Sequence, residues 1–257
     1  MIQRVRPAIG TFVAIEAGAR TEGSALAAIN AAFAAIERVG SLLHPRTGRD
    51  SRLLAGARIG EIVRLDPWSY DVLSVCRELH AASGGVFDPC LPESPGRMDR
   101  IDLSAVGCAA KLDDVALDLG GIAKGFAVDR AVAALREWGC ESGLVNAGGD
   151  VRVFGPGAKE ILLRSASGEA YAVELADEAA AVSEPKSARS PAEHVGYYDG
   201  LSRKRVAGRW VAVTAPLAVL ADGLVKCAML CPPKAVDSLL ARYRARVIVR
   251  PDSGRRG

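Results

Sequence analysis

The alternation of apolar and polar residues predicts strands and helices in no regular order. Residues 12–17 alternate as an opening strand, and apolar positions with helical spacing form one face from Ser24 to Leu43. A strand is predicted over 59–65, followed by a helix from Pro67 to Ala82. Later strands are predicted over 159–165, 170–176, 179–183, 210–215 and 245–249, and later helices after Pro216 and over 235–243. This irregular mixture favours the α+β class, with mixed sheets and packed helices.

Three segments and the tail show weak periodicity. Residues 44–51 are polar and predict a loop, and residues 90–114, rich in proline, glycine and charge, predict a variable excursion. Residues 184–208 combine several prolines and glycines with polar residues and predict a mobile loop. The basic tail, 251–257, is expected to be disordered. The length of the chain predicts a single domain over 1–257, which two sub-lobes could form.

Composition and charge bear on the protein's partners, its location and the state of its cysteines. A formal net charge of +3, without a dense basic patch between aromatic residues, argues against a nucleic-acid partner. The amino terminus lacks an apolar leader and no run of 18 apolar residues occurs, so we expect no membrane span and a cytoplasmic location. The six cysteines form no C-x-x-C pair, which predicts free thiols; Cys227 and Cys231 lie one helical turn apart.

The chemically distinctive stretch is 115–155. The apolar run from Val115 to Asp118 meets Gly120-Gly121, and helical spacing follows from Val128 to Trp138. This pattern predicts a strand, a glycine turn and a helix. Paired glycines let a ligand approach the backbone N–H groups, while the new helix points its positive end at that ligand. With Lys124 in the first helical turn, the arrangement suits a diphosphate.

A second glycine turn follows about 25 residues later. Asn146-Ala147-Gly148-Gly149-Asp150 comes after the apolar Leu144-Val145 and leads into the alternating residues 151–154. Two such turns joined by a helix could line one pocket. The alternative is that each glycine pair is only a tight connection between packed elements. The spacing matches neither the P-loop nor the dinucleotide fingerprint.

The residues of this stretch also carry a family resemblance. DLGGIAKGFAVD at 118–129, followed by LVNAGGD at 144–150, resembles the signature of the FAD:protein FMN transferases, the ApbE-like flavin transferases. Further matches, in family order over nearly the whole chain, are Ile9-Gly10-Thr11, Asp50-Ser51-Arg52-Leu53-Leu54, Ser83 to Pro89 and Ala221 to Leu224. The resemblance implies an ApbE-like, T-fold-like architecture.

The resemblance implies a reaction and a substrate. An acceptor flavoprotein would use a Thr or Ser hydroxyl to attack the FMN-side phosphorus of FAD, and AMP would leave. The residues implied to contact FAD are Ile9, Val86, Phe87, Asp88, Asp118, Gly120, Gly121, Lys124, Gly148 and Gly149. For Asp88 the residues alone also allow a simpler role, as the cap of a turn between elements. The oligomeric state is not predicted.

The resemblance further implies Mg²⁺, held by Asp222 and the carbonyl oxygen of Gly121. Hard oxygen ligands of this kind suit the ion. The hydroxyl ligand usual in the family one helical turn after the aspartate is missing, because Val225 and Lys226 stand there. Lys226 shares a helix face with Asp222. Either its ammonium group replaces part of the cation's charge, or the two residues form a surface salt bridge beside a weak metal site.

Candidate bases and other histidines complete the prediction. His194, in HVGYYDG, is the nearest match to the family's histidine turn, and a histidine suits proton removal from the acceptor hydroxyl. Asp199 is the second candidate, and an exposed bystander role for His194 stays open. Ser183 could touch the flavin or only end a strand, and His44 could contact the flavin or cap a helix. No chemistry is assigned to His80.

Two functions are compatible with these residues. The first is an active FMN transferase that uses FAD and Mg²⁺. The second is a catalytically impaired relative that keeps the FAD pocket and acts as a flavin-binding or interaction protein. The glycine turns, Asp118 and Asp129 favour FAD binding in both cases, whereas the changes at 225–226 and around His194 favour the second function.

Overall fold

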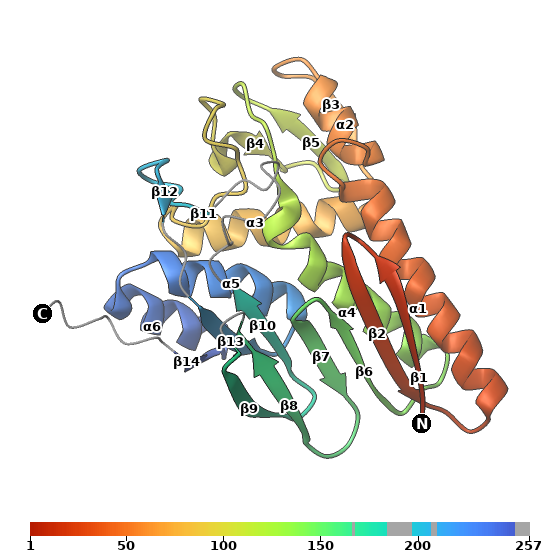
Figure 1. Ribbon diagram of the computed structural model, residues 1–257. Helices are drawn as coiled ribbons and strands as arrows, with labels where there is room; N and C mark the ends of the chain where they lie inside the picture. Colours follow the sequence, from red (N-terminus) through yellow and green to blue (C-terminus); the bar gives the residue numbers. More distant parts are fainter. Residues whose placement is uncertain (166–167, 184–196, 207–209, 250–257) are drawn as a thin grey trace, which may run out of the picture.

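A computed structural model describes residues 1–165, 168–183, 197–206 and 210–249. Its main sheet has seven strands in the order β1-β2-β6-β7-β10-β13-β14, and every neighbouring pair is antiparallel (Figure 1). The strands are β1 (Ile2–Ala8), β2 (Thr11–Gly18), β6 (Ser142–Ala147), β7 (Asp150–Phe154), β10 (Ala179–Ser183), β13 (Val211–Ala215) and β14 (Arg246–Val249). The predicted α+β class is confirmed.

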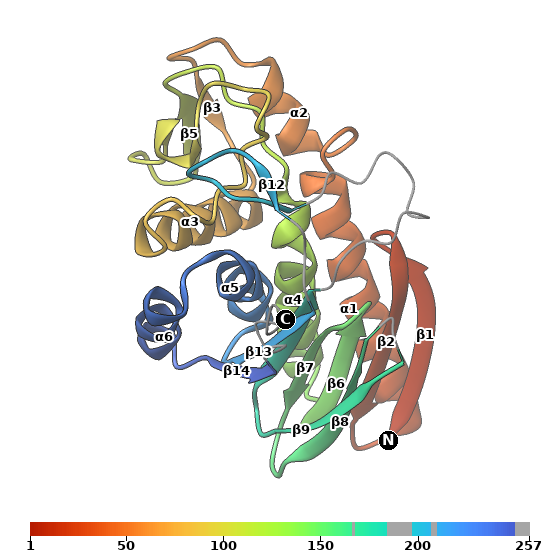
Figure 2. The ribbon, with the colours of Figure 1, turned by 60° about the vertical axis from the view of Figure 1, so that its left-hand side comes forward.

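Three helices cover one face of this sheet (Figure 2). They are α1 (Glu22–Leu43), α4 (Ala123–Glu137) and α5 (Ala218–Leu230), and they pack on β2, β6, β7, β10 and β13. Their buried apolar stripes form the main core, as the helical spacing predicts. α1 is long and apolar enough to cross a membrane by composition, yet half of its most apolar window is buried here. The absence of a membrane span therefore stays a prediction.

A hairpin covers part of the opposite face. Strands β8 (Lys159–Arg164) and β9 (Ala170–Leu175) pair with each other and bury Leu163, Val173 and Leu175. These side chains form a second, smaller core with residues of β6, β7, β10 and β13. Both faces of the sheet's centre are thereby kept from water, which explains why every residue of β7 and β13 is buried.

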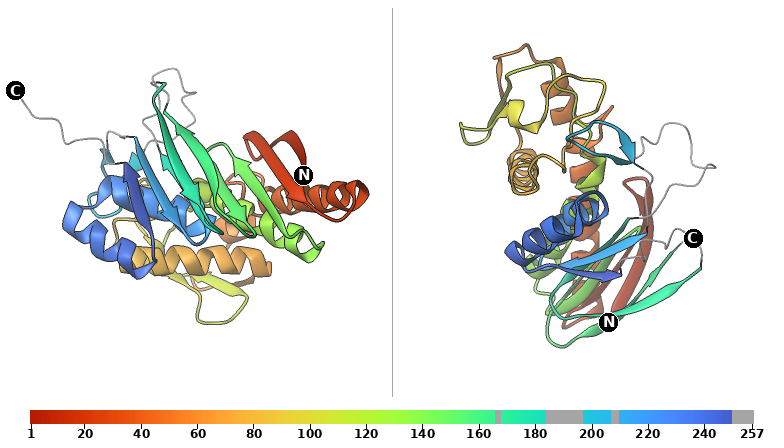
Figure 3. Two further views of the ribbon diagram at one scale, coloured as in Figure 1. Left: turned by 90° about the horizontal axis from the view of Figure 1, so that it is seen from below. Right: turned by 90° about the vertical axis from the view of Figure 1, so that its left-hand side faces the viewer.

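A smaller tier lies beside the helices (Figure 3). It contains α3 (Pro67–Ala82) and a three-stranded sheet in the order β3-β5-β4, formed by β3 (Ile62–Arg64), β4 (Ile101–Asp102) and β5 (Cys108–Lys111). The short helices α2 (Arg49–Gly56) and η1 (Met98–Arg100) belong to the same region of the chain. The remaining described elements are the short helix η2 (Leu119–Gly121), helix α6 (Pro233–Arg242) and hairpin β11–β12 (Tyr197–Tyr198, Arg205–Val206). The single-domain assignment stays a prediction.

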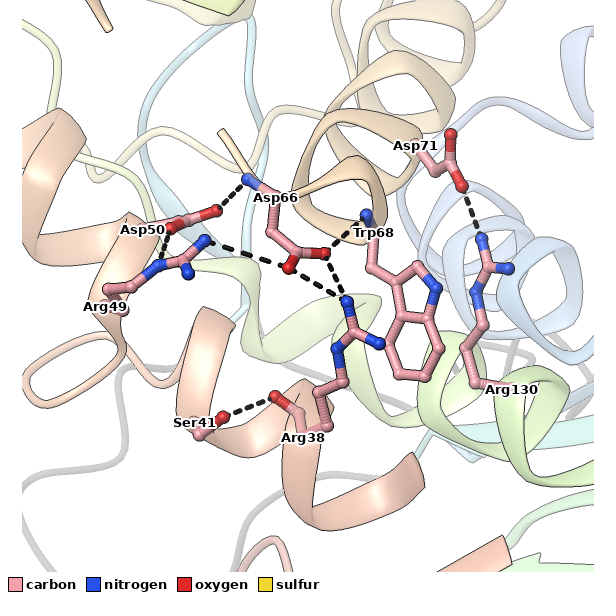
Figure 4. Close-up of polar contacts among 8 residues, drawn as sticks. All are labelled: Arg38, Ser41, Arg49, Asp50, Asp66, Trp68, Asp71 and Arg130. Carbon is pink, nitrogen blue, oxygen red and sulfur yellow. Dashed lines mark hydrogen bonds and ion pairs between the residues drawn. The ribbon is translucent and has the colours of Figure 1, made fainter. Parts of the chain in front are cut away.

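A polar joint ties α1, α2 and α3 together (Figure 4). The buried Asp50 carboxylate accepts from the Asp66 amide at 2.7 Å and from Arg49 Nε at 2.6 Å. Asp66 in turn caps α3 and pairs with Arg38 at 3.0 Å. The Arg38 guanidinium also lies 4.1 Å above the Trp68 ring. Within the family-like motif at 50–54, Asp50 therefore connects helices in this structure.

Most predicted elements are confirmed, and the corrections occur in irregular segments. Strand β1 is not predicted, because its residues alternate poorly as the exposed edge of the sheet. Residues 44–51 include the start of α2, and residues 90–114 contain η1, β4 and β5 where an excursion is predicted. The predicted strand at 115–118 is wrong: only an isolated bridge joins Leu117 to Cys90. All six cysteines are free, as predicted.

Candidate active site

The two glycine turns meet through a side-chain contact. Gly120 and Gly121 lie in the short helix η2 (Leu119–Gly121), directly before α4, and Gly148 and Gly149 join β6 to β7. Lys124 in the first turn of α4 forms an ion pair with Asp150, the residue after the second turn. Asp150 is 1% exposed, whereas the Lys124 side chain is 34% exposed. The predicted juxtaposition of the two turns is therefore present in the structure.

Helix α5 brings a second carboxylate to the same place. Asp222 is completely buried, and its Oδ2 accepts the Gly125 N–H at 3.0 Å. This approach requires glycine at 125, because an added Cβ would lie 2.3 Å from the Ala218 oxygen and 2.7 Å from the Asp222 Cβ. The positive end of α4, which the sequence assigns to a diphosphate, thus faces the Asp222 carboxylate.

Lys226 completes a group of four charges. Its Nζ forms an ion pair with Asp222 Oδ1, one helical turn earlier on α5. Its Cε would lie 3.8 Å from a Cβ placed on Gly121, so the side chain runs beside the first glycine turn. The interpretation of this pair as a surface salt bridge is wrong, since Asp222 is 0% and the Lys226 side chain only 14% exposed. We call Lys124, Asp150, Asp222 and Lys226 the charge cluster.

Burial and mutual attraction set the ionisation of the charge cluster. Burial and the nearby Asp222 charge raise the pKa of Asp150 to about 6, although both lysines oppose this shift. Burial would also raise the pKa of Asp222, but Lys226 and Lys124 outweigh it and hold the pKa below its ordinary value. The carboxylates Asp222 and Asp150 overcome the effect of burial on Lys124 and raise its pKa. The Lys124 ammonium group therefore stays charged at neutral pH.

Some turn amides are already used inside the turns. The Gly120 N–H donates to Asp118 Oδ1 at 2.8 Å, and the Gly149 N–H donates to Asn146 Oδ1 at 3.1 Å. The sequence suggests that these two amides face a ligand. In the structure, each is instead bonded within its own turn. The positive side chains beside the two turns are those of Lys124 and Lys226. Asp118 positions the first turn and is the cap of η2.

The turn between β1 and β2 lies against the second glycine turn. A Cβ on Gly148 would come 2.5 Å from Thr11 Oγ1, and Gly148 has a φ of +63°, so glycine is required there on both counts. The preceding Ile9 has a φ of +44° and packs on Gly40 of α1. The turn that carries Ile9, the first predicted contact, thus reaches Gly148 through Thr11, while Ile9 itself lies against Gly40.

The predicted contact segment 86–88 is held by His80. His80 Nδ1 lies 3.0 Å from the Phe87 oxygen and 3.6 Å from Asp88 Oδ2, so this histidine has an acidic neighbour that its sequence position does not reveal. Asp88 Oδ1 accepts the Cys90 N–H at 2.9 Å, which fits the turn-capping role. Its Oδ2 is buried without a hydrogen-bond partner among the described residues. Burial, together with the nearby charges of Asp88 and Asp222, raises the pKa of the Cys76 thiol on α3.

Hairpin β11–β12 covers segment 86–88. The Gly200 N–H donates to the Val86 oxygen at 3.0 Å, and a Cβ on Gly200 would lie 2.2 Å from the Gly85 oxygen. Asp199 accepts from the Leu201 N–H and the Ser202 hydroxyl, at 3.0 and 2.8 Å. Burial would raise the pKa of Asp199, but the hydrogen bonds from Ser202 and Leu201 outweigh it and lower the pKa. Its carboxylate thus serves its own turn, and its catalytic role stays a prediction. His194 lies outside the described residues.

The sequence analysis gives no partner for two buried aspartates. Asp150 ends a matched motif but has no assigned role, because its partner Lys124 is 26 residues away. Asp129 accepts from the Ala218 and Val219 amides at 3.0 and 2.8 Å and pairs with Arg152 at 2.6 Å. It caps α5, the helix that carries Asp222 and Lys226. Ser183 ends β10 and is buried, and the His44 ring accepts from the Arg46 and Thr47 amides.

The donor set around Asp222 does not fit Mg²⁺. One carboxylate oxygen faces the Lys226 ammonium group and the other accepts the Gly125 N–H. An ammonium group has no lone pair to donate to a metal. Among the described residues, no group of three or more His, Cys, Asp or Glu side chains could hold a metal ion. The predicted metal ligands, Asp222 and Gly121, therefore flank a lysine side chain.

A hollow in the described part of the molecule has none of the charge-cluster residues in its lining. It has a volume of about 420 Å³ and lies between α6 and β14. Its lining is Asp237, Leu240, Ala241, Ala245, Arg246 and Val247. None of the residues predicted to contact FAD contributes to it.

Comparison with known proteins confirms the resemblance. Residues 93–186 match the sequence model described as the ApbE family. The FAD:protein FMN transferase of Rhodobacter capsulatus is 29% identical over 176 residues, which are 57% of this chain and 33% of that protein. The match thus spans about a third of that relative's length.

Solved structures share the fold over nearly the whole chain. The flavinyl transferase ApbE of Pseudomonas stutzeri, in its apo form, aligns with a TM-score of 0.76 and 19% identity, covering 98% of this chain and 93% of that one. The flavin transferase ApbE of Vibrio cholerae aligns with a TM-score of 0.81 and 17% identity, covering 98% and 94%. The ApbE protein of Thermotoga maritima gives 0.80 and 20%, covering 96% and 93%. The predicted ApbE-like architecture is confirmed.

Proposed function

We propose that this chain, which has the ApbE fold, transfers FMN from FAD to a Ser or Thr hydroxyl of an acceptor flavoprotein and releases AMP. The observation that carries the proposal is the charge cluster, which places two ammonium groups beside the glycine turns that the family signature marks. The Rhodobacter capsulatus relative, described as an FAD:protein FMN transferase, supports the same activity.

The reaction needs positioning and positive charge more than covalent help. The acceptor oxygen forms a bond to the FMN-side phosphorus, the bond from that phosphorus to the bridging oxygen breaks, and AMP leaves with that oxygen. Negative charge grows on the phosphoryl and leaving-group oxygens, and fixed cations in a partly water-excluded site stabilise it. Lys124 and Lys226 supply such cations. The hydroxyl proton passes to a base, for which His194 and Asp199 remain the candidates.

Segment 86–88 and the two turns would frame the flavin. Burial of Val86 and Phe87 offers an apolar wall, and the hydrogen bond from His80 keeps the backbone of this segment fixed. The turn that carries Ile9 lies against Gly148 through Thr11. The cytoplasmic location expected from the sequence is part of the proposal.

The test combines the purified chain, FAD and a flavoprotein fragment that carries a Ser or Thr acceptor site, with and without Mg²⁺. We expect covalent flavin fluorescence on the fragment after denaturing electrophoresis, and AMP in equal amount. Lys124→Met should lower the rate by roughly 10-fold or more, because a charge-assisted contact is lost. Lys159→Met, which breaks the ion pair between Lys159 of β8 and Glu16 of β2, is the matched control. Tightly bound FAD without transfer to any acceptor would instead indicate a flavin-binding protein.

A further inference from the structure

We infer that the ammonium group of Lys226 stands in the place of a divalent cation, so that this chain binds the FAD diphosphate without a metal. The inference rests on the proposed function and specifies how its site supplies positive charge. It begins from the disagreement between the metal that the family resemblance implies and the residues that surround Asp222.

The position of Lys226 is the first argument. Its Nζ contacts Asp222, and its Cε runs beside Gly121. These are the two residues predicted to hold Mg²⁺, and the end of the lysine side chain lies between them. Position 225 cannot supply a replacement ligand, because Val225 is 0% exposed in the apolar core.

Charge balance is the second argument. A magnesium site commonly combines carboxylates with phosphate oxygens, so that negative charge offsets the dication. In the charge cluster Lys124 and Lys226 already match Asp150 and Asp222. A dication at Asp222 would have to displace an ammonium group and would be repelled by the other one as well.

Donor geometry is the third argument. An ammonium group has three N–H donors, and Asp222 takes one of them in the part of the chain that the structure describes. The rest are available to a phosphate oxygen beside the first glycine turn. The helix spacing of Asp222 and Lys226 fixes the ammonium group, so the charge is in place before FAD arrives.

Direct metal binding tests the inference without FAD. The full chain is freed of metal with EDTA, and uptake of Mn²⁺ is followed by the loss of the free-ion EPR signal. We expect no uptake by the wild-type chain, and uptake by Lys226→Thr and Lys226→Met, which remove the ammonium group. Adding Asp222→Asn to either variant should abolish the uptake again. Wild-type uptake that Asp222→Asn abolishes, or folded Lys226 variants that take up no Mn²⁺, would overturn the inference.

Flavin binding gives the second readout. Quenching of FAD fluorescence by the wild-type chain should give the same affinity in EDTA and in Mg²⁺. For Lys226→Met we expect affinity in EDTA to fall by about 10- to 100-fold, and Mg²⁺ to restore part of it. Lys159→Met should match the wild type. If the Lys226 variants fail to fold, a wild-type affinity that collapses in EDTA still refutes the inference, and an unchanged one supports it.

The two proposals fail in different ways. A wild-type chain that binds no FAD under any condition would remove the proposed function, whereas the Mn²⁺ experiment would still decide which cation occupies Asp222. Transfer that strictly requires Mg²⁺, together with Mn²⁺ uptake by the wild type, would keep the function and remove the inference.

Discussion

At the scale of single residues, buried carboxylates in this protein are held by partners far away in the sequence. Asp222, Asp150, Asp129 and Asp50 are each buried or nearly so, and each accepts from or pairs with a residue of another element. Removing one partner of such a contact leaves a charge or donor without compensation, which is costly inside a protein. We therefore expect these aspartates to contribute to stability.

Asp50 provides a prediction with a defined pH dependence. Burial opposes its ionisation, but hydrogen bonds from Arg49 and the Asp66 amide hold its pKa below the ordinary value. A depressed pKa adds stability above the unfolded-state pKa, and this contribution is lost as the pH falls. We expect Asp50→Asn to lower the free energy of unfolding by about 1–3 kcal/mol at pH 7, and by less below about pH 4. Urea unfolding at several pH values measures this difference.

The control for Asp50 is Asp114→Asn, because Asp114 is an exposed loop aspartate. The unfolding free energy of Asp114→Asn should equal that of the wild type at every pH. A loss in Asp50→Asn that is equally large at pH 7 and pH 3.5 would show that the ionised carboxylate is not the stabilising group.

At the scale of elements, the site depends on how α4 and α5 are fixed to each other. Gly125 lets the two helices approach, and Asp129 of α4 accepts from the first amides of α5. Helix α5 has no cap from its own flanking residue, so Asp129 supplies that cap from another helix. The placement of Asp222 and Lys226 follows from this contact.

Replacing Asp129 by alanine should destabilise the protein more than removing an ordinary cap. Asp129→Ala also leaves the largely buried Arg152 without its ion-pair partner, so we expect a loss of roughly 3–5 kcal/mol. Thr21→Ala removes only the cap of α1 and should cost about 1 kcal/mol. Urea denaturation of both variants provides the comparison. Equal losses would mean that the Asp129–Arg152 pair contributes little.

At the scale of the whole molecule, the site is assembled from segments spread over the chain. The β1–β2 turn, both glycine turns and α5 meet there, while hairpin β8–β9 packs on the opposite face of the sheet. A ligand that binds the charge cluster therefore links the main sheet to helices α4 and α5. Binding to the folded state suppresses local opening of the segments that it joins.

Hydrogen exchange measures this linkage directly. We expect FAD to slow amide exchange in residues 120–125, 146–150 and 218–226, and to leave residues 159–164 and 170–175 unchanged. Mass spectrometry of peptides from exchanged protein, with and without FAD, resolves these ranges. Protection confined to peptides from α6 and β14 would place the ligand in the separate hollow and contradict the assigned site.

The sequence by itself determined the helices and strands with strong periodicity, the two glycine turns, the ApbE resemblance and the spacing of Asp222 and Lys226. These features depend on neighbouring residues, so local patterns reveal them. It did not determine the edge strand β1, the strands β4 and β5 within 90–114, or the partners of His80, Asp129 and Asp150. Only the tertiary structure decided that Lys226 is buried against Asp222 beside Gly121, because burial and long-range pairing depend on segments that meet after folding.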